Sequence, residues 1–130
     1  MANKPNLNDL TRRERQIMEI IYRQGSATAV GVMEGLPGKP VNATVRTMLS
    51  VLEEKGFLRH ESERGRYVYY PTIPLTKARK KALDNLLETF FRGSEANAVI
   101  SILKRSDARL SDEERERIID LIEKSESEGR

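Results

Sequence analysis

The chain has 130 residues, of which 38% are hydrophobic and 33% charged, and this length suits one domain or two small ones. No stretch approaches the roughly 18 apolar residues that a membrane span needs, and the first residues lack the apolar core of a secretion signal. The absence of cysteine and the single histidine exclude disulfides and thiolate metal sites, so we expect a cytoplasmic protein with no metal and no cofactor.

The net charge of +3 is unevenly distributed along the chain. Residues 1–74 carry 11 Lys and Arg against 8 Asp and Glu, whereas residues 75–130 carry 12 against 12. The positive excess therefore lies in the N-terminal half. It is compatible with a polyanionic partner such as nucleic acid and equally with a role in solubility alone.

The first two predicted helices lie between residues 11 and 35. Thr11 and Glu14 have the spacing of a capping box, which predicts a helix start, and Gly25 is a suitable C-terminal cap. A short second helix is expected from Thr28, as its N-cap, to about residue 35. Its predicted apolar face consists of Val30, Met33 and Leu36.

A third helix is predicted between Asn42, as its N-cap, and Gly56. Its apolar stripe, with the spacing i, i+3, i+4 and i+7, is Val45, Met48, Leu49 and Leu52. The opposite face has Ala43 and, apart from Glu54, lacks the Glu and Lys side chains of an ordinary solvated helix. It carries short hydroxyls and one guanidinium instead, from Thr44, Arg46, Thr47 and Ser50.

Alternating β-branched and aromatic residues after Gly56 predict a hairpin. Its strands should cover about residues 57–62 and 66–72, with a tight turn at residues 63–65. Arg64 lies at the tip, and Arg59 and Arg66 lie on the flanking strands. The second strand carries three tyrosines, which alternation would divide between its two faces. Packing of the hairpin onto the core is their expected role, and a stacking platform for single-stranded nucleic acid is the less favoured interpretation.

Three helices followed by a hairpin is the order of a winged helix-turn-helix, in which the third helix enters the DNA major groove and the hairpin lies over the backbone. Hydroxyls and arginine suit that helix, because they donate to phosphates and base edges without the repulsion that a carboxylate meets. Chance clustering on a solvated face is the alternative. The predicted DNA-binding residues are Lys39, Asn42, Thr44, Arg46, Thr47, Ser50, Arg64 and Arg66.

Residues 75–130 are predicted to form a helical domain, separated from a DNA-binding domain at residues 1–74 by two prolines. Its helices should cover residues 75–92, with Thr76 as N-cap, about 95–104, and from the capping box of Ser111 and Glu114 to a frayed end at 125–130. Three helices in so short a segment make a marginal core, which a second copy of the chain would complete. The residues expected at that dimer interface are Leu83, Leu86, Leu87, Phe90, Phe91, Val99, Leu103, Ile118, Ile119 and Ile122.

No set of residues suggests catalysis or metal binding. His60 has no second histidine or cysteine to complete a metal site, so we expect it on the strand surface. The acidic run near residue 113 reads as the first turn of a helix, and neither a phosphate-binding glycine loop nor a nucleophile with a base is present. The expected fold is mostly α with a small β-hairpin wing.

Four segments resemble the BlaI/MecI/CopY family of bacterial transcriptional repressors: "LTRRERQIMEIIY", "NATVRTMLSVLEEKGFL", "GRYVYYP" and "LSDEERERIIDLIEK". The resemblance covers nearly the whole chain. It implies a homodimer with an N-terminal winged helix and a C-terminal dimerisation domain, which represses genes by occupying inverted repeats in promoters. By the same likeness Thr44, Arg46 and Thr47 fall on the family's base- and phosphate-contacting positions.

Two features depart from that family. In its antibiotic-resistance branch a membrane sensor protease cuts an Asn–Phe bond in the fifth helix, and Ser101 and Ile102 stand in the corresponding place here. This difference argues against the same protease as a partner. The copper-responsive branch carries a C-terminal cysteine cluster, which a chain without cysteine cannot provide.

The sequence therefore predicts a non-enzymatic, sequence-specific repressor that binds a double-stranded operator as a homodimer and is located at the nucleoid. Two alternatives remain. One is a ligand-responsive regulator resembling the MarR family, in which a small molecule enters between the domains. The other is a winged helix used as a protein-interaction module, which would not bind duplex DNA.

Overall fold

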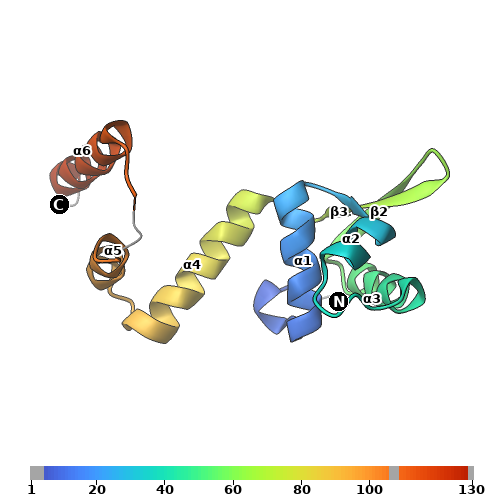
Figure 1. Cartoon of the computed structure of the whole chain (residues 1–130). Coiled ribbons are helices and arrows are strands. Elements are labelled where there is room, and N and C mark those ends of the chain that lie inside the picture. Colours follow the sequence, from blue (N-terminus) through green and yellow to red (C-terminus); the bar gives the residue numbers. More distant parts are fainter. Residues whose placement is uncertain (1–4, 106–108, 129–130) are drawn as a thin grey trace. The chain divides into compact units, whose positions relative to one another are not determined.

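The computed structural model describes residues 5–105 and 109–128 (Figure 1). It is mostly helical with one small antiparallel sheet, which confirms the predicted fold class. The chain forms two compact units, Met1–Asn85 and Leu86–Arg130, and helix α4 runs across the division. The N-terminal unit contains a short 3-10 helix η1 (Leu7–Asp9), then α1 (Arg12–Gln24), β1 (Ala27–Thr28), α2 (Ala29–Gly35), α3 (Asn42–Glu54), β2 (Leu58–Glu63) and β3 (Arg66–Pro71).

The ends of α1 and the start of α2 form as the sequence predicts. The Thr11 N–H donates to Glu14 Oε1 at 3.0 Å and the Glu14 N–H donates to Thr11 Oγ1 at 3.2 Å, which completes the capping box. Gly25 ends α1 with a φ of 89°, a left-handed conformation that suits a residue without Cβ. The Gly31 N–H donates to Thr28 Oγ1 at 3.1 Å and caps α2.

The sheet has the order β1-β3-β2 and is antiparallel throughout. Strands β2 and β3 form the predicted hairpin, called the wing below, which projects from the three helices (Figure 1). Its turn uses Arg64 and Gly65 with φ angles of 54° and 78°, the backbone of a type I′ turn. Strand β1 was not predicted, because two residues are too few to show alternation.

The hydrophobic core lies between α1, α2, α3 and the inner face of the sheet. Three residues of the predicted α3 stripe are fully buried and Met48 is half-buried, which confirms that stripe. The predicted inner face of α2 is wrong in one residue: Val30 is 45% exposed, and Val32 is buried in its place together with Leu36, one helical turn away. The largest fully buried side chains are Ile17, Ile21, Val32, Val45, Leu49, Leu52 and Leu58.

Two predicted N-caps are wrong by one or two residues. Helix α3 begins after Val41, whose carbonyl accepts from the Val45 N–H at 3.1 Å, so Asn42 is the first helical residue and its side chain caps nothing. In α4 the carbonyl of Pro74 accepts from the Ala78 N–H at 3.0 Å, which places Thr76 inside the first turn. In both cases a backbone carbonyl one or two residues earlier already accepts the first helical hydrogen bond.

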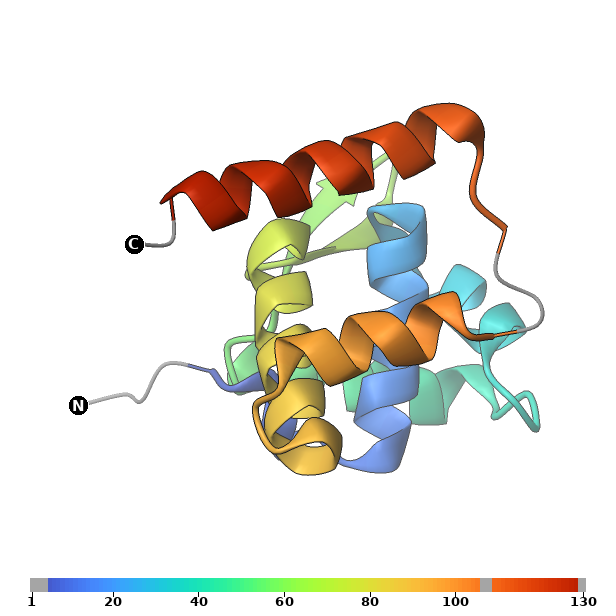
Figure 2. The same cartoon turned by 90° about the vertical axis from the view of Figure 1, so that its left-hand side faces the viewer.

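The remaining helices are α4 (Leu75–Phe91), α5 (Glu95–Leu103) and α6 (Asp112–Glu128) (Figures 1 and 2). Ser111 and Glu114 form the predicted capping box, with N–H to side-chain oxygen distances of 2.8 and 3.1 Å. Helix α6 continues to Glu128, so the predicted fraying from residue 125 is wrong up to that point, and residues 129–130 lie outside the described residues. Among the helices of residues 5–105 and 109–128, none is both long and apolar enough to cross a membrane.

Candidate nucleic-acid interface

The outer face of α3 carries the polar residues that the sequence singled out. Thr44, Arg46, Thr47 and Ser50 are all exposed. The Thr47 hydroxyl donates to the Ala43 carbonyl at 3.0 Å, so in the free protein its proton is engaged while its methyl group and its oxygen lone pairs remain accessible. The first two turns of this face therefore offer hydroxyl, guanidinium and methyl groups to a partner, and no carboxylate.

The loop before α3 is fixed from α1. Arg13 Nη1 donates to the Pro37 carbonyl at 2.9 Å and to Gln16 Oε1 at 3.1 Å. This contact holds the loop in which Lys39 adopts a positive φ of 41° and exposes its side chain. Asn42 is half-buried at the start of α3, and its Oδ1 is buried with no hydrogen-bond partner in the part of the chain described.

The two faces of the wing differ in how their charges are used. On the outer face the Arg59 guanidinium pairs with Glu61 and lies 4.5 Å from the centre of the Tyr70 ring, and the Tyr70 hydroxyl donates to Glu63 at 2.5 Å. Arg59 is therefore neutralised within the wing. Arg64 and Arg66 form no ion pair with any described residue, so their charges remain available to an anion.

The inner face of the wing is attached to α3 through His60. Its Nδ1 lies 2.7 Å from both carboxylate oxygens of Glu53, and its ring stacks on Tyr67 with a centroid distance of 4.1 Å. Tyr69 is buried on this face whereas Tyr67 is 55% exposed, so only Tyr69 packs into the core as predicted for the tyrosines. Residues 5–105 and 109–128 contain no cluster of His, Asp or Glu able to hold a metal ion.

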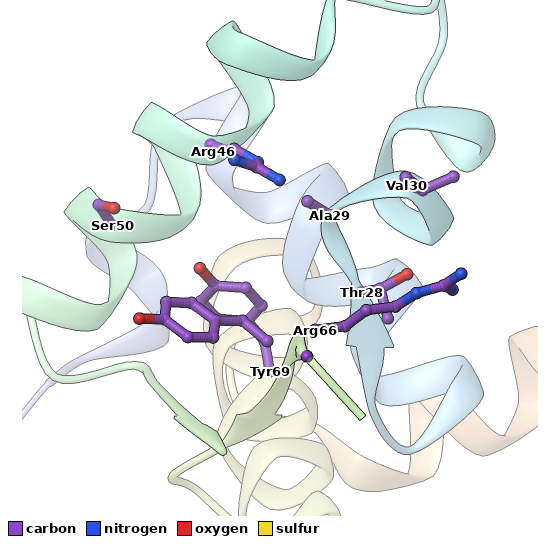
Figure 3. A pocket seen from close by; sticks show the side chains of 9 residues that line it. Thr28, Ala29, Val30, Arg46, Ser50, Arg66 and Tyr69 are labelled. Atoms are coloured by element: carbon purple, nitrogen blue, oxygen red, sulfur yellow. The ribbon is translucent and has the colours of Figure 1, made fainter. Parts of the chain in front are cut away.

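A cleft of about 640 Å³ separates α3 from the wing (Figure 3). Arg46 and Ser50, four residues apart on α3, line one side of it, and Tyr69 rises from β3 with Arg66 beyond it, extending past Thr28 (Figure 3). Asp and Glu are absent from its lining residues. Of the predicted DNA-binding residues the cleft gathers Arg46, Ser50 and Arg66, whereas Lys39, Asn42, Thr44, Thr47 and Arg64 lie outside it.

The sequence predicted that Tyr69 packs against the core but not that it also lines this cleft. Burial raises the pKa of its phenol, Glu53 raises it further, and Arg46 acts in the opposite direction. The hydroxyl therefore stays protonated at neutral pH and is available as a hydrogen-bond donor. The alternation of the wing tyrosines indicated two faces, but only the pairing of β3 with β1 and the packing of α3 show which face is covered.

The predicted dimer residues lie on α4, α5 and α6 and are largely uncovered in the single chain. Phe90 is 73% exposed, and Leu87, Phe91 and Ile118 are half-buried. The other predicted residues are between 42% and 56% exposed, namely Leu83, Leu86, Val99, Leu103, Ile119 and Ile122. Five further apolar residues of this half that the prediction omitted are also exposed, namely Leu75, Ile100, Ile102, Leu110 and Leu121.

Residues 10–124 match the sequence model of the penicillinase repressor family, which covers most of the chain. The chain belongs to the penicillinase repressor family. This confirms the resemblance noted from the sequence, and it makes the protein a member of a family of DNA-binding transcriptional repressors.

Curated relatives of this penicillinase repressor family member agree at modest identity. The methicillin resistance regulatory protein MecI of Staphylococcus aureus (strain N315) is 22% identical over 89% of this chain and 94% of its own, and the penicillinase repressor of Bacillus licheniformis is 26% identical over 95% and 94%. An uncharacterised 16.5 kDa protein of Latilactobacillus sakei is 31% identical over 64% of this chain, and the match spans 58% of that relative's length. The solved structure of Bordetella bronchiseptica BpsR, from a study of how 6-hydroxynicotinic acid regulates its DNA binding, is 20% identical with a TM-score of 0.49, over 90% of this chain and 76% of that one.

Proposed function

We propose that this family member represses transcription by binding an inverted-repeat operator as a homodimer, without catalysis. One observation carries the proposal: Arg46 of α3 and Arg66 of the wing line one cleft in which no Asp or Glu takes part. Two uncompensated guanidinium groups on the third helix and the wing are what a winged helix needs to approach a polyanion.

The roles within the interface follow from chemistry and position. Thr44 and Thr47 are exposed on α3 and present a methyl group and a hydroxyl, which suit the thymine methyl and base-edge acceptors of the major groove. Lys39, before α3, and Arg64, at the wing tip, are exposed cations suited to phosphates on either side. Affinity would then depend steeply on salt, and sequence preference would come from α3.

The homodimer is supported by the uncovered apolar residues of α4, α5 and α6. A soluble monomer rarely leaves so many large apolar side chains in water, and their burial against a second copy would supply the main driving force for association. Two copies related by a two-fold axis would present two α3 helices to the DNA. The operator would then have to consist of inverted half-sites.

The test is a gel-shift titration of the purified full chain against fragments of its own gene's upstream region and against random duplex, over a series of salt concentrations. We expect preferential binding to one upstream fragment that weakens steeply as salt rises. Arg46→Ala should cost about 1–3 kcal/mol of operator binding. The matched control is Arg23→Ala, an exposed arginine in the last turn of α1, which should leave binding unchanged.

Three results would count against the proposal. Absence of binding to any duplex at low salt would leave the interaction module as the better account. Equal, weak binding to all fragments would show that the protein binds DNA without preferring an operator in this region. An unchanged affinity of Arg46→Ala would remove α3 from the interface.

A further inference from the structure

The cleft between α3 and the wing contains a polar group to which neither the fold nor the proposed reading of bases gives a role. Tyr69 is only 5% exposed, and its ring packs into the core while its hydroxyl belongs to the cleft wall and points toward α3 (Figure 3). Within residues 5–105 and 109–128 the hydroxyl has no hydrogen-bond partner. The other half-buried or buried tyrosine hydroxyls do have one, since Tyr22 donates to Ile73 and Tyr70 to Glu63.

A phenol in this position is a preorganised donor. Packing fixes the ring, so the hydroxyl loses little side-chain freedom when a ligand arrives. The hydroxyl is not among the buried unpaired polar atoms of the described residues, so water satisfies it in the free protein, and an acceptor in the cleft would replace that water. The structure thus provides a donor of fixed position that no described protein group occupies.

The charges around Tyr69 favour an anionic acceptor. Arg46 and Arg66 are lining residues of the cleft, with the Arg66 side chain extending past Thr28, and Ser50 adds a second hydroxyl (Figure 3). The carboxylate of Glu53, which raises the pKa of Tyr69, is directed to His60 and does not line the cleft: both of its oxygens lie 2.7 Å from His60 Nδ1. An anion in the cleft would therefore meet donors and cations on both sides.

We propose that Tyr69 donates its hydrogen bond to a phosphodiester of the DNA backbone, which passes between α3 and the wing with Arg46 and Arg66 on either side of it. The proposal rests on the proposed function and adds a binding residue to it. A cleft of about 640 Å³, bounded by the two elements that face the duplex, has room for a stretch of sugar-phosphate backbone and not only for one small ion. Tyr69 then sets how deeply the backbone sits, and hence the register of α3 against the bases, without reading sequence itself.

The test compares Tyr69→Phe with Tyr70→Phe in the full chain. Both substitutions delete one phenolic oxygen from neighbouring residues of β3, but the Tyr70 hydroxyl bonds Glu63 and lies outside the cleft. We expect Tyr69→Phe to weaken binding about ten- to a hundredfold, the effect of losing one hydrogen bond to a charged group, and to do so equally for the operator fragment and for random duplex. Tyr70→Phe should bind as the wild type does.

The salt dependence separates this role from that of a cation. Tyr69→Phe should leave the slope of log affinity against log salt unchanged, because no positive charge is removed, whereas Arg66→Gln should reduce its magnitude by about 0.9. Single neutral methylphosphonates placed along the duplex give a second measurement. The position that Tyr69 contacts should weaken the wild type more than it weakens Tyr69→Phe, in which only the attraction to the arginines is left to lose.

The outcomes distinguish this proposal from the function on which it rests. Operator binding by the wild type with an unchanged affinity of Tyr69→Phe would overturn the Tyr69 assignment alone. A loss confined to the operator and absent on random duplex would assign Tyr69 to a base and overturn the phosphate contact. If Tyr69→Phe also lowers the melting temperature, the methylphosphonate scan of the wild type decides instead. The Tyr69 assignment is overturned if Arg46→Ala and Arg66→Gln account for every sensitive position in that scan. Failure of the wild type to bind any duplex would overturn both proposals.

Discussion

Glu14 is the one charged residue buried among the residues that the structure describes, at 7% exposure. It accepts from the Thr11 N–H at 3.0 Å and from Lys55 Nζ at 2.8 Å, so it joins the start of α1 to the end of α3. Burial alone would raise the pKa of this carboxyl, but the Lys55 ammonium, followed by the Thr11 N–H, outweighs burial and lowers it. The contact therefore stabilises the charged form of Glu14 in the folded state.

This shift fixes the sign of a pH effect on stability. A carboxyl whose pKa is lower in the folded than in the unfolded chain contributes stability above its unfolded value of 4.5, and that contribution is lost as pH falls through the folded pKa. Glu14→Gln keeps an acceptor for Thr11 but loses the ion pair, so it should lower the free energy of unfolding at pH 7 by roughly 0.5–1 kcal/mol, since Lys55 is partly solvated.

Urea unfolding at pH 7 and pH 3 measures this effect. The wild type should lose more stability between the two pH values than Glu14→Gln does. Glu19→Gln, an exposed residue of the same helix, is the control and should show the wild-type pH dependence. Equal pH dependence in wild type and Glu14→Gln would contradict the role given to the pair.

The residues of this contact show where prediction from sequence stops. The capping box of Thr11 and Glu14 was predictable, because both partners lie within one helical turn and their spacing is fixed by the backbone. The bond to Lys55, 41 residues away, was not, since no local pattern relates the two. Tyr69 belongs to the second kind: its alternation was visible, but its place in the cleft depends on how α3 packs over the sheet.

At the scale of elements, the wing is defined by its turn. Arg64 and Gly65 both have positive φ, which Asn-Gly adopts more easily than Arg-Gly does. Arg64→Asn should therefore keep or slightly raise stability, while it removes one cation and reduces the magnitude of the salt slope of DNA binding by about 0.9. Gel shifts over a salt series together with a melting curve measure both effects.

The variant Gly65→Ala is the matched control for the turn itself. Nothing lies within 4 Å of the position a Cβ would occupy, so the cost is conformational and comes from the φ of 78° alone. It should weaken binding by distorting the turn, with the charge of Arg64 still present. A salt slope that stays at the wild-type value in Arg64→Asn would show that the tip of the wing does not contact phosphate.

Helices and strands were predictable where their hydrophobic pattern extends over enough residues to show a period. All six helices and the hairpin carry periodic apolar residues and recognisable ends, whereas β1 has two residues and exists because β3 offers it a partner. The starts of α3 and α4 were misplaced because Asn42 and Thr76 are good caps in isolation. In both helices the start is set by the residue just before it, Val41 or Pro74, whose carbonyl accepts the first helical hydrogen bond.

At the scale of the whole molecule, the two halves of the chain differ in how they bury their apolar residues. The N-terminal unit buries its large apolar residues within one chain, and its core is continuous across three helices and the sheet. The helices α4, α5 and α6 leave many of theirs in water. We therefore expect the N-terminal unit to fold as a monomer, whereas the stability of the C-terminal helices should depend on protein concentration.

Phe90→Glu should convert the proposed dimer into a monomer. The side chain is 73% exposed in the single chain, and in a two-fold interface each substitution acts twice. Removing two buried phenylalanines, each worth about 2 kcal/mol, raises the dissociation constant roughly a thousandfold before the repulsion between the new charges is counted. Sedimentation velocity over a concentration series measures the change.

Val41→Glu adds the same charge at a residue that is 67% exposed in the N-terminal unit, and it should leave the oligomeric state unchanged. If Phe90→Glu and the wild type sediment alike, the apolar residues of these helices do not mediate dimerisation, and an operator of two half-sites loses its physical basis.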